Sequence, residues 1–274
     1  MYKRLELHNH TNESDAVFTC KELTDFMVAD HVDAFSLTDH NTISGHYKIE
    51  NYLKEHPQPI AFIPGMEYTT YYGHILCLNL TEYVPWENIN KHKPELLFQA
   101  AREKGALVGV AHPYSFGWPF AQGCRFEMTI TDYSCCDFIE IFNNPEPLHE
   151  VNEKGVKLWE DLVLSGENIA ATCGMDLHGN SSLHGHYSTY IEGEPEGDVC
   201  QELSDAIHHQ RTWVCKGPLL EVHNDGEALS FTIHGVSDRI PLTSFKEDRI
   251  IIPMLFEKET IIENLVCTSP VIHL

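Results

Sequence analysis

Two histidines separated by one residue, in the stretch His8-Asn9-His10, are the first residues of this chain that could do chemistry. Alternate side chains of a strand point to the same face, so both imidazoles would project together from the end of the first apolar run. A carboxylate, Asp15, follows five residues after His10. Imidazole and carboxylate groups that converge in this way are ligands for a transition-metal ion. The pair alone does not distinguish a metal site from surface histidines, because the chain contains 18 histidines.

Further histidines and carboxylates fall at the ends of apolar runs that read as strands. We expect these strands near residues 5–7, 34–38, 61–67, 74–80, 107–111, 138–142 and 170–174. Asp39, His40, Glu67, His112, Asp176 and His178 each stand at or just beyond the end of such a run, and His74 begins one. Any one of them could cap a turn. The whole set indicates a site, since metal and catalytic groups of α/β barrels gather at the carboxyl ends of the strands.

The elements that must position these residues alternate along the chain. Amphipathic patterns predict helices near residues 20–30, 43–56, 94–104, 146–165 and 197–209. Strand followed by helix, repeated, predicts a mostly parallel sheet, which enough repeats would close into a barrel. Beyond Cys215 the runs become β-rich, with a hairpin turn at Asn224-Asp225-Gly226. We therefore expect an α/β domain over residues 1–215 and a small C-terminal β appendage over residues 216–274.

Composition excludes several classes of protein. The 274 residues and 42% hydrophobic content suffice for one large α/β domain. A formal charge of −23 disfavours duplex nucleic acid and anionic membranes as partners. The beginning of the chain has no signal-peptide pattern and no run of 18 apolar residues occurs, so the cytoplasm is the expected location. Nine cysteines, an odd number without a C-x-x-C pair, predict reduced thiols rather than a disulfide framework.

Four motifs in order resemble those of the PHP family, the polymerase and histidinol phosphatase superfamily of metal-dependent phosphoesterases. They are His8-Asn9-His10 with Ser14-Asp15, then Thr38-Asp39-His40-Asn41, Ala111-His112-Pro113 and Gly174-Met175-Asp176-Leu177-His178; Gly65-Met66-Glu67 and Gly73-His74 match further ligand positions. The resemblance covers roughly residues 4 to 192. It implies a distorted seven-stranded (β/α) barrel with two or three divalent ions at the strand ends.

The resemblance also implies a ligand set for each ion. The first ion would take His8, His10, Glu67 and Asp176, the second His74 and His112 with Glu67 as a bridge, and the third Asp15, His40 and His178. Manganese, iron and zinc all suit such donors, so the metal stays open. Two departures are visible: some members have histidine where Asp15 stands, and Met175 and Leu177 replace small residues of the fourth motif.

The function that this resemblance implies is metal-dependent hydrolysis of a phosphate ester in a small phosphorylated molecule. A monoester, nucleotide, cyclic phosphate and sugar phosphate all remain open as substrates, as does the oligomeric state. One alternative is a hydrolase of C–N bonds, because a metal-activated hydroxide also attacks carbonyls. Another is a non-catalytic metal-binding regulatory module, which the nine filled ligand positions disfavour.

Three residues are candidates for contact with substrate or for catalysis. Asp39, beside His40, would orient a ligand or a water, and a plain turn role fits it as well. Arg125 would clamp phosphate from the loop FGWPFAQGCRFE (116–127), although an exposed loop arginine is equally expected. Asn143, at the end of a strand, would meet substrate or begin a turn into a helix. Aromatic residues of the same loop, among them Trp118 and Phe120, would wall a pocket.

Overall fold

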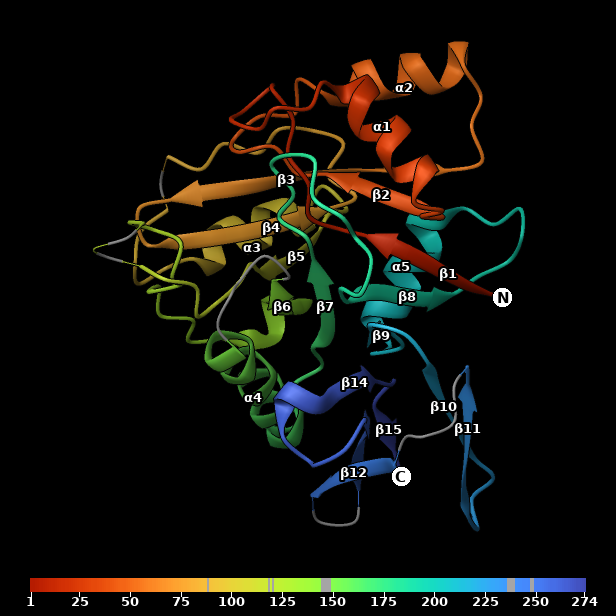
Figure 1. Ribbon diagram of the computed structural model, residues 1–274. Helices are drawn as coiled ribbons and strands as arrows, with labels where there is room; N and C mark the ends of the chain where they lie inside the picture. The colour runs from red at the N-terminus through yellow and green to blue at the C-terminus, as the bar shows by residue number, and fades with distance from the viewer. Residues whose placement is uncertain (88, 118, 120, 144–148, 236–239, 247–248) are drawn as a thin grey trace.

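The computed structural model describes residues 1–87, 89–117, 119, 121–143, 149–235, 240–246 and 249–274 (Figure 1). Each of the seven expected strands and five expected helices is present, with ends shifted by at most three residues. The helices are α1 (Cys20–Ala29), α2 (His46–Glu55), α3 (Glu95–Arg102), α4 (His149–Ser165) and α5 (Val199–His208). The strands up to residue 215 are β1 (Tyr2–Glu6), β2 (Ala34–Leu37), β3 (Ala61–Thr70), β4 (Gly73–Leu78), β5 (Leu107–Val110), β6 (Phe138–Asn143), β7 (Ala170–Gly174), β8 (Ser188–Glu192) and β9 (Trp213–Cys215).

Local signals explain where two of the helices begin. Thr19 precedes α1 and accepts a hydrogen bond from the Glu22 backbone N–H, while the Glu22 side chain accepts one from the Thr19 backbone. This reciprocal capping box satisfies N–H groups that a helix start leaves unpaired. At the start of α5, the Asp198 side chain accepts hydrogen bonds from the backbone N–H groups of Cys200 and Gln201.

Apart from the hairpin of β10 and β11, the described strands form one open sheet, not a closed barrel. Its order is β12-β13-β14-β9-β8-β1-β2-β3-β4-β5-β6-β7, with β15 pairing β13. Strands β1, β2 and β3 pair in parallel, as do β5, β6 and β7. Closure of a barrel would require β7 to pair with β1. Beyond the ends of these two strands, the described residues form one isolated parallel bridge, Asn9 to Leu177. The expected barrel closure is therefore not observed.

The sheet is also less parallel than the alternation of strand and helix predicts. Strand β4 is antiparallel to both β3 and β5. The reason is the connection: Tyr71 and Tyr72 alone separate β3 from β4, and a two-residue connection can join only antiparallel strands. The amino end of β4 consequently lies at the same edge as the carboxyl ends of the parallel strands.

The C-terminal segment is β-rich, as expected. It contains β10 (Leu219–Asn224), β11 (Leu229–His234), β12 (Ile240–Lys246), β13 (Ile250–Phe256), β14 (Leu265–Thr268) and β15 (Ile272–His273), with a short 3-10 helix, η2 (Ile262–Asn264). Strands β10 and β11 form a separate hairpin. Strand β14 pairs β9, so β12, β13 and β14 continue the main sheet, in the blue region of Figure 1.

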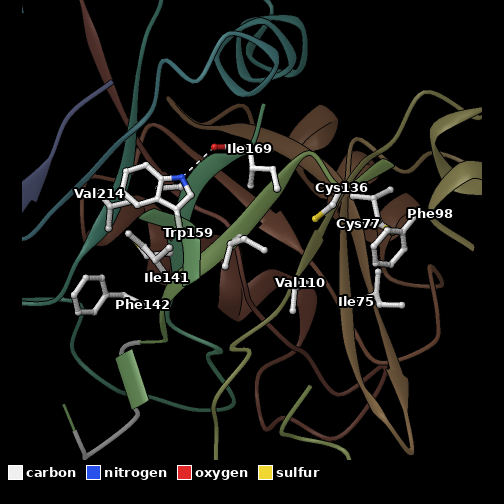
Figure 2. Close-up of a cluster of buried hydrophobic side chains, with 14 of the residues drawn as sticks. Ile75, Cys77, Phe98, Val110, Cys136, Ile141, Phe142, Trp159, Ile169 and Val214 are labelled. Carbon is white, nitrogen blue, oxygen red and sulfur yellow. Dashed lines mark hydrogen bonds between the residues drawn. The ribbon is translucent and has the colours of Figure 1, made fainter. Parts of the chain in front are cut away.

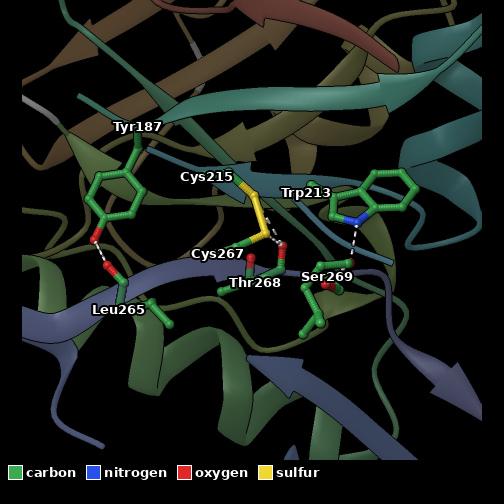
Figure 3. Close-up of a disulfide and its surroundings, with 8 residues drawn as sticks. Tyr187, Trp213, Cys215, Leu265, Cys267, Thr268 and Ser269 are labelled. Carbon is green, nitrogen blue, oxygen red and sulfur yellow. Dashed lines mark hydrogen bonds between the residues drawn. A yellow bond between two sulfur atoms is a disulfide. The ribbon is translucent and has the colours of Figure 1, made fainter. Parts of the chain in front are cut away.

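The expectation that the cysteines are reduced thiols is wrong for one pair. Cys215 on β9 and Cys267 on β14 form a disulfide (Figure 3), whereas the other seven cysteines are thiols. The two residues stand directly opposite each other in antiparallel strands, with Cα atoms 4.2 Å apart. A sequence separation of 52 hid this pairing, because only the sheet brings the two strands together.

Helix α4 packs on β6 and stabilises this part of the sheet. The Trp159 side chain is buried against Ile141 and Val214, and its indole N–H donates to the Ile169 carbonyl at 3.0 Å (Figure 2). A buried tryptophan whose N–H has a partner contributes a large apolar contact without an unpaired polar group. No helix within the described part of the chain is long and apolar enough to cross a membrane.

Candidate metal centre

Nine imidazole and carboxylate side chains converge at one edge of the sheet. His8 and His10 follow β1, His40 follows β2, Glu67 lies in β3, His112 follows β5, and Asp176 and His178 follow β7; Asp15 comes from the loop after β1. His74 reaches the same edge from the beginning of β4, because that strand runs antiparallel to its neighbours. The side chains form three overlapping groups, each able to hold a metal ion: His8, His10, Glu67 and Asp176; Glu67, His74 and His112; His10, Asp15, His40 and His178.

Glu67 is the centre of this arrangement. Its Oε1 lies 2.9 Å from His74 Nδ1 and 3.1 Å from His112 Nε2. Its Oε2 lies 3.4 Å from His8 Nε2 and 2.8 Å from His40 Nδ1. The two oxygens of one fully buried carboxylate thus face different groups of histidines. A carboxylate placed in this way could hold an ion with each of its oxygens.

The first group contains a buried polar atom that a metal ion would satisfy. His8 Nε2, which faces Glu67 and Asp176, is buried and has no hydrogen-bond partner among the residues that the structure describes. A buried polar atom without a partner is costly, and a bound cation would satisfy it. Asp176 Oδ1 completes the group, at 3.4 Å from His8 Nε2 and 3.0 Å from His10 Nε2.

The third group lies at the solvent-facing side of the cluster. Asp15 Oδ1 is 3.2 Å from His178 Nε2 and 3.5 Å from His40 Nε2. The Asp15 side chain is 60% exposed and that of His178 is 38% exposed, whereas His8 and Glu67 are fully buried. His10 also belongs to this group, which the resemblance did not imply. The cluster therefore runs from a buried pair of sites to an accessible one.

Hydrogen bonds to the far ring nitrogens orient the histidines. His112 Nδ1 lies 3.0 Å from the Cys124 carbonyl and His178 Nδ1 lies 2.8 Å from the Asp176 carbonyl. A carbonyl only accepts, so both Nδ1 atoms carry a proton, which leaves Nε2 as the nitrogen that would bind a metal ion. His40 Nδ1 lies 2.5 Å from Thr69 Oγ1. Such outer partners fix the tautomer and the direction of a metal ligand.

The charges of the site compensate one another. Burial opposes ionisation of Asp176, but the neighbouring His8 and His10 outweigh it and hold its pKa well below the usual range. Burial likewise opposes the charged form of His112, and the carboxylate of Glu67 raises its pKa to about 9. In the metal-free protein, protons on the imidazoles supply positive charge. Metal ions would take over that charge and release these protons.

Two of these residues adopt backbone conformations that are rare outside glycine. His112 has φ 27° and Asp176 has φ 49°. Strained residues of this kind persist only where surrounding contacts hold them, and they concentrate at functional sites. Gly174 packs against His8 so closely that a Cβ at position 174 would lie 2.3 Å from His8 Cβ.

The three other candidates lie around the cluster. The buried Asp39 carboxylate accepts hydrogen bonds from Thr11 N–H at 2.7 Å, Thr11 Oγ1 at 2.6 Å and Ser14 Oγ at 2.6 Å. Asn143 Nδ2 donates to Asp176 Oδ2 at 3.1 Å. Asn143 thus contacts the ligand Asp176, and Asp39 contacts the loop that contains Asp15.

Arg125 is exposed and follows Cys124, the residue whose carbonyl holds His112. Its Nε donates to the Ser115 carbonyl at 3.3 Å, and it forms no ion pair with a described residue. Trp118 and Phe120, two of the aromatic residues proposed to wall a pocket, lie outside the described residues.

Sequence reasoning missed Glu140, which contacts two of the histidines. Its Oε1 lies 2.9 Å from His8 Nδ1, and its Oε2 accepts a hydrogen bond from the His112 backbone N–H at 2.8 Å. The signal was present: FIEIF is an apolar strand with a single acid in its middle, and carboxylates are almost never fully buried unless paired.

No family model matches the sequence, and no curated protein matches it significantly. The fold, in contrast, has a clear likeness among solved structures. A two-domain protein from Bacteroides vulgatus, described as containing a predicted PHP-like metal-dependent phosphoesterase, has a TM-score of 0.63 at 17% identity, over 100% of this chain and 88% of that chain. The two chains therefore share a fold.

Two further solved structures are less similar. An amidohydrolase from Chromobacterium violaceum, solved with sulfate and no metal, has a TM-score of 0.46 at 15% identity, over 73% of this chain and 96% of that chain. A protein from Bifidobacterium adolescentis, provisionally named a metal-dependent phosphoesterase, has a TM-score of 0.47 at 12% identity, over 73% and 95%.

Proposed function

We propose that this chain is a metal-dependent phosphoesterase that hydrolyses a phosphate ester in a small phosphorylated molecule. The observation that carries the proposal is Glu67, whose two oxygens face separate groups of histidines within a buried cluster. The PHP-like fold supports the same assignment. We assign one ion to each of the three ligand groups, with manganese, iron and zinc as candidates.

Ions bound in this cluster would lower the pKa of a water toward neutrality, so that it can attack phosphorus, and would neutralise phosphate oxygens. The residues of the chain do the positioning. Glu67 holds two ligand groups at a fixed separation, and the outer hydrogen bonds of His112 and His178 aim their Nε2 atoms. The exposed side at Asp15 and His178 provides the approach for an anionic substrate.

Arg125 is the proposed phosphate contact outside the ligand groups. Its guanidinium is exposed and free of an ion pair with any described residue, and a planar fork of N–H donors matches phosphate oxygens. We propose that Asn143 acts through Asp176, and that Asp39 acts through the loop that carries Asp15.

The test is phosphate release from a panel of phosphomonoesters, nucleotides, cyclic phosphates and sugar phosphates. Each assay supplies manganese, iron or zinc, with a chelated control. Turnover that needs metal, and that His10→Ala and Asp176→Ala abolish, supports the proposal. His92→Ala is the matched control, because His92 is exposed and belongs to none of the ligand groups. Metal-loaded protein that is inert on the whole panel, or that instead releases amines from amides, would overturn the phosphoesterase assignment.

A further inference from the structure

Glu140 is a buried carboxylate that touches the metal cluster without belonging to any of its ligand groups. We propose that Glu140 is a positioning residue that holds the first and second ion sites in a fixed relation to each other. This inference rests on the proposed metal centre and names a residue that controls it. Its two oxygens have different partners, one in each site.

The first partner is the imidazole of His8. Glu140 Oε1 lies 2.9 Å from His8 Nδ1, so this nitrogen carries the proton and donates to the carboxylate. The opposite nitrogen, Nε2, is then the one that would bind an ion, and it lies 3.4 Å from both Glu67 Oε2 and Asp176 Oδ1. A carboxylate behind a ligand histidine fixes its orientation and raises its basicity.

The second partner is the backbone of His112. Glu140 Oε2 accepts from its N–H at 2.8 Å, at a residue whose φ of 27° is unfavourable for a side chain with a Cβ. The Cys124 carbonyl holds the imidazole of the same residue at 3.0 Å. These two contacts place His112 Nε2 3.1 Å from Glu67 Oε1, in the second site.

The packing around Glu140 leaves it little freedom. Strand β7 places Gly174 against it, and a Cβ at that position would lie 2.8 Å from Glu140 Oε1 and 2.3 Å from His8 Cβ. The carboxylate is therefore confined to the position where it reaches both histidines. With each oxygen engaged by an N–H donor, Glu140 acts on the ions through His8 and His112.

Glu140→Gln tests this role with almost no change in size. Both partners are donors, and glutamine offers one acceptor oxygen and one NH2 group, so one N–H would face another donor. We expect the two tightest metal affinities to fall about 10- to 100-fold, as is typical for loss of an outer partner of a metal ligand. The measurement is competition between the stripped protein and a chromophoric chelator for Zn²⁺ or Mn²⁺. Glu153→Gln, on the exposed face of α4, is the matched control.

A structural role and a positioning role give different results. If Glu140→Gln lowers the melting temperature of the chelated protein but binds metal as tightly as wild type, the inference is overturned. If the variant does not fold, Glu140→Asp replaces it; this variant keeps both acceptor oxygens but shortens their reach, and the same loss of affinity is expected. A wild-type protein that binds no metal would refute the proposed function itself, since this assay needs no substrate.

Discussion

The loop that carries Asp15 is attached to the end of β2 by one buried carboxylate, that of Asp39. Its Oδ1 accepts from Thr11 N–H at 2.7 Å and Ser14 Oγ at 2.6 Å, and its Oδ2 accepts from Thr11 Oγ1 at 2.6 Å. His40, the next residue, belongs to the third ligand group. Replacing Asp39 should therefore disturb the third site and leave the two buried sites largely intact.

The size of the effect follows from these three hydrogen bonds. Asp39→Ala removes an ionised acceptor from three donors, and a hydrogen bond to a charged group contributes about 1.5–3 kcal/mol. Ser14 is half-buried and its hydroxyl can turn to water, whereas the Thr11 N–H is buried and loses its partner. We therefore expect Asp39→Ala to lower the free energy of unfolding by roughly 2–4 kcal/mol. Asp39→Asn keeps the shape and one acceptor, so about 1–2 kcal/mol is expected.

Two measurements test this reasoning. Urea unfolding of the chelated protein gives the change in stability. Metal content after dialysis at graded metal concentrations gives the number of bound ions, and Asp39→Asn should lose the third ion first. Activity lost in this way should return at higher metal concentration. Asp132→Asn is the control, because Asp132 accepts a backbone N–H at 3.0 Å in an exposed turn. An Asp39→Asn protein that holds every ion and is still inactive would show that Asp39 takes part in the chemistry.

Three further predictions concern packing, pH and metal. Gly174→Ala should destabilise the chelated protein by roughly 1–3 kcal/mol in urea unfolding, because its Cβ would overlap His8 Cβ; wild-type stability would mean that the site has room. Burial raises the pKa of Glu6 from its ordinary 4.5 to about 8, so the folded state holds this proton and unfolding releases it. Stability of the chelated protein should then fall as pH rises from about 4.5 to about 8, by at most about 1.4 kcal/mol per pH unit. Glu6→Gln should flatten that slope, and parallel slopes would contradict the assignment. Finally, Zn²⁺ or Mn²⁺ at 100 times its Kd should add about 2.7 kcal/mol of stability for each site, seen as a higher melting temperature that a chelator reverses; an unchanged melting temperature would argue against the centre.

Local sequence determined the secondary structure and most of the donors in the cluster. Period-two and period-3.6 apolar patterns depend on near neighbours, so the seven strands and five helices were predictable from the residues themselves. The same holds for donors such as His8, His10 and Asp176, because a polar residue that ends an apolar run lies at a strand end in any α/β arrangement.

Only the tertiary structure decided which strands pair and which buried groups meet. His74 reaches the cluster because β4 is antiparallel, and Cys215 meets Cys267 because β9 pairs β14. Glu140 contacts His8 across 132 positions of sequence. Sheet pairing and side-chain contacts at such separations depend on the packing of the whole chain, whereas local propensity acts over a few residues. For that reason the ligands of the cluster were visible in the sequence, but the contacts of Glu140 with His8 and His112 were not.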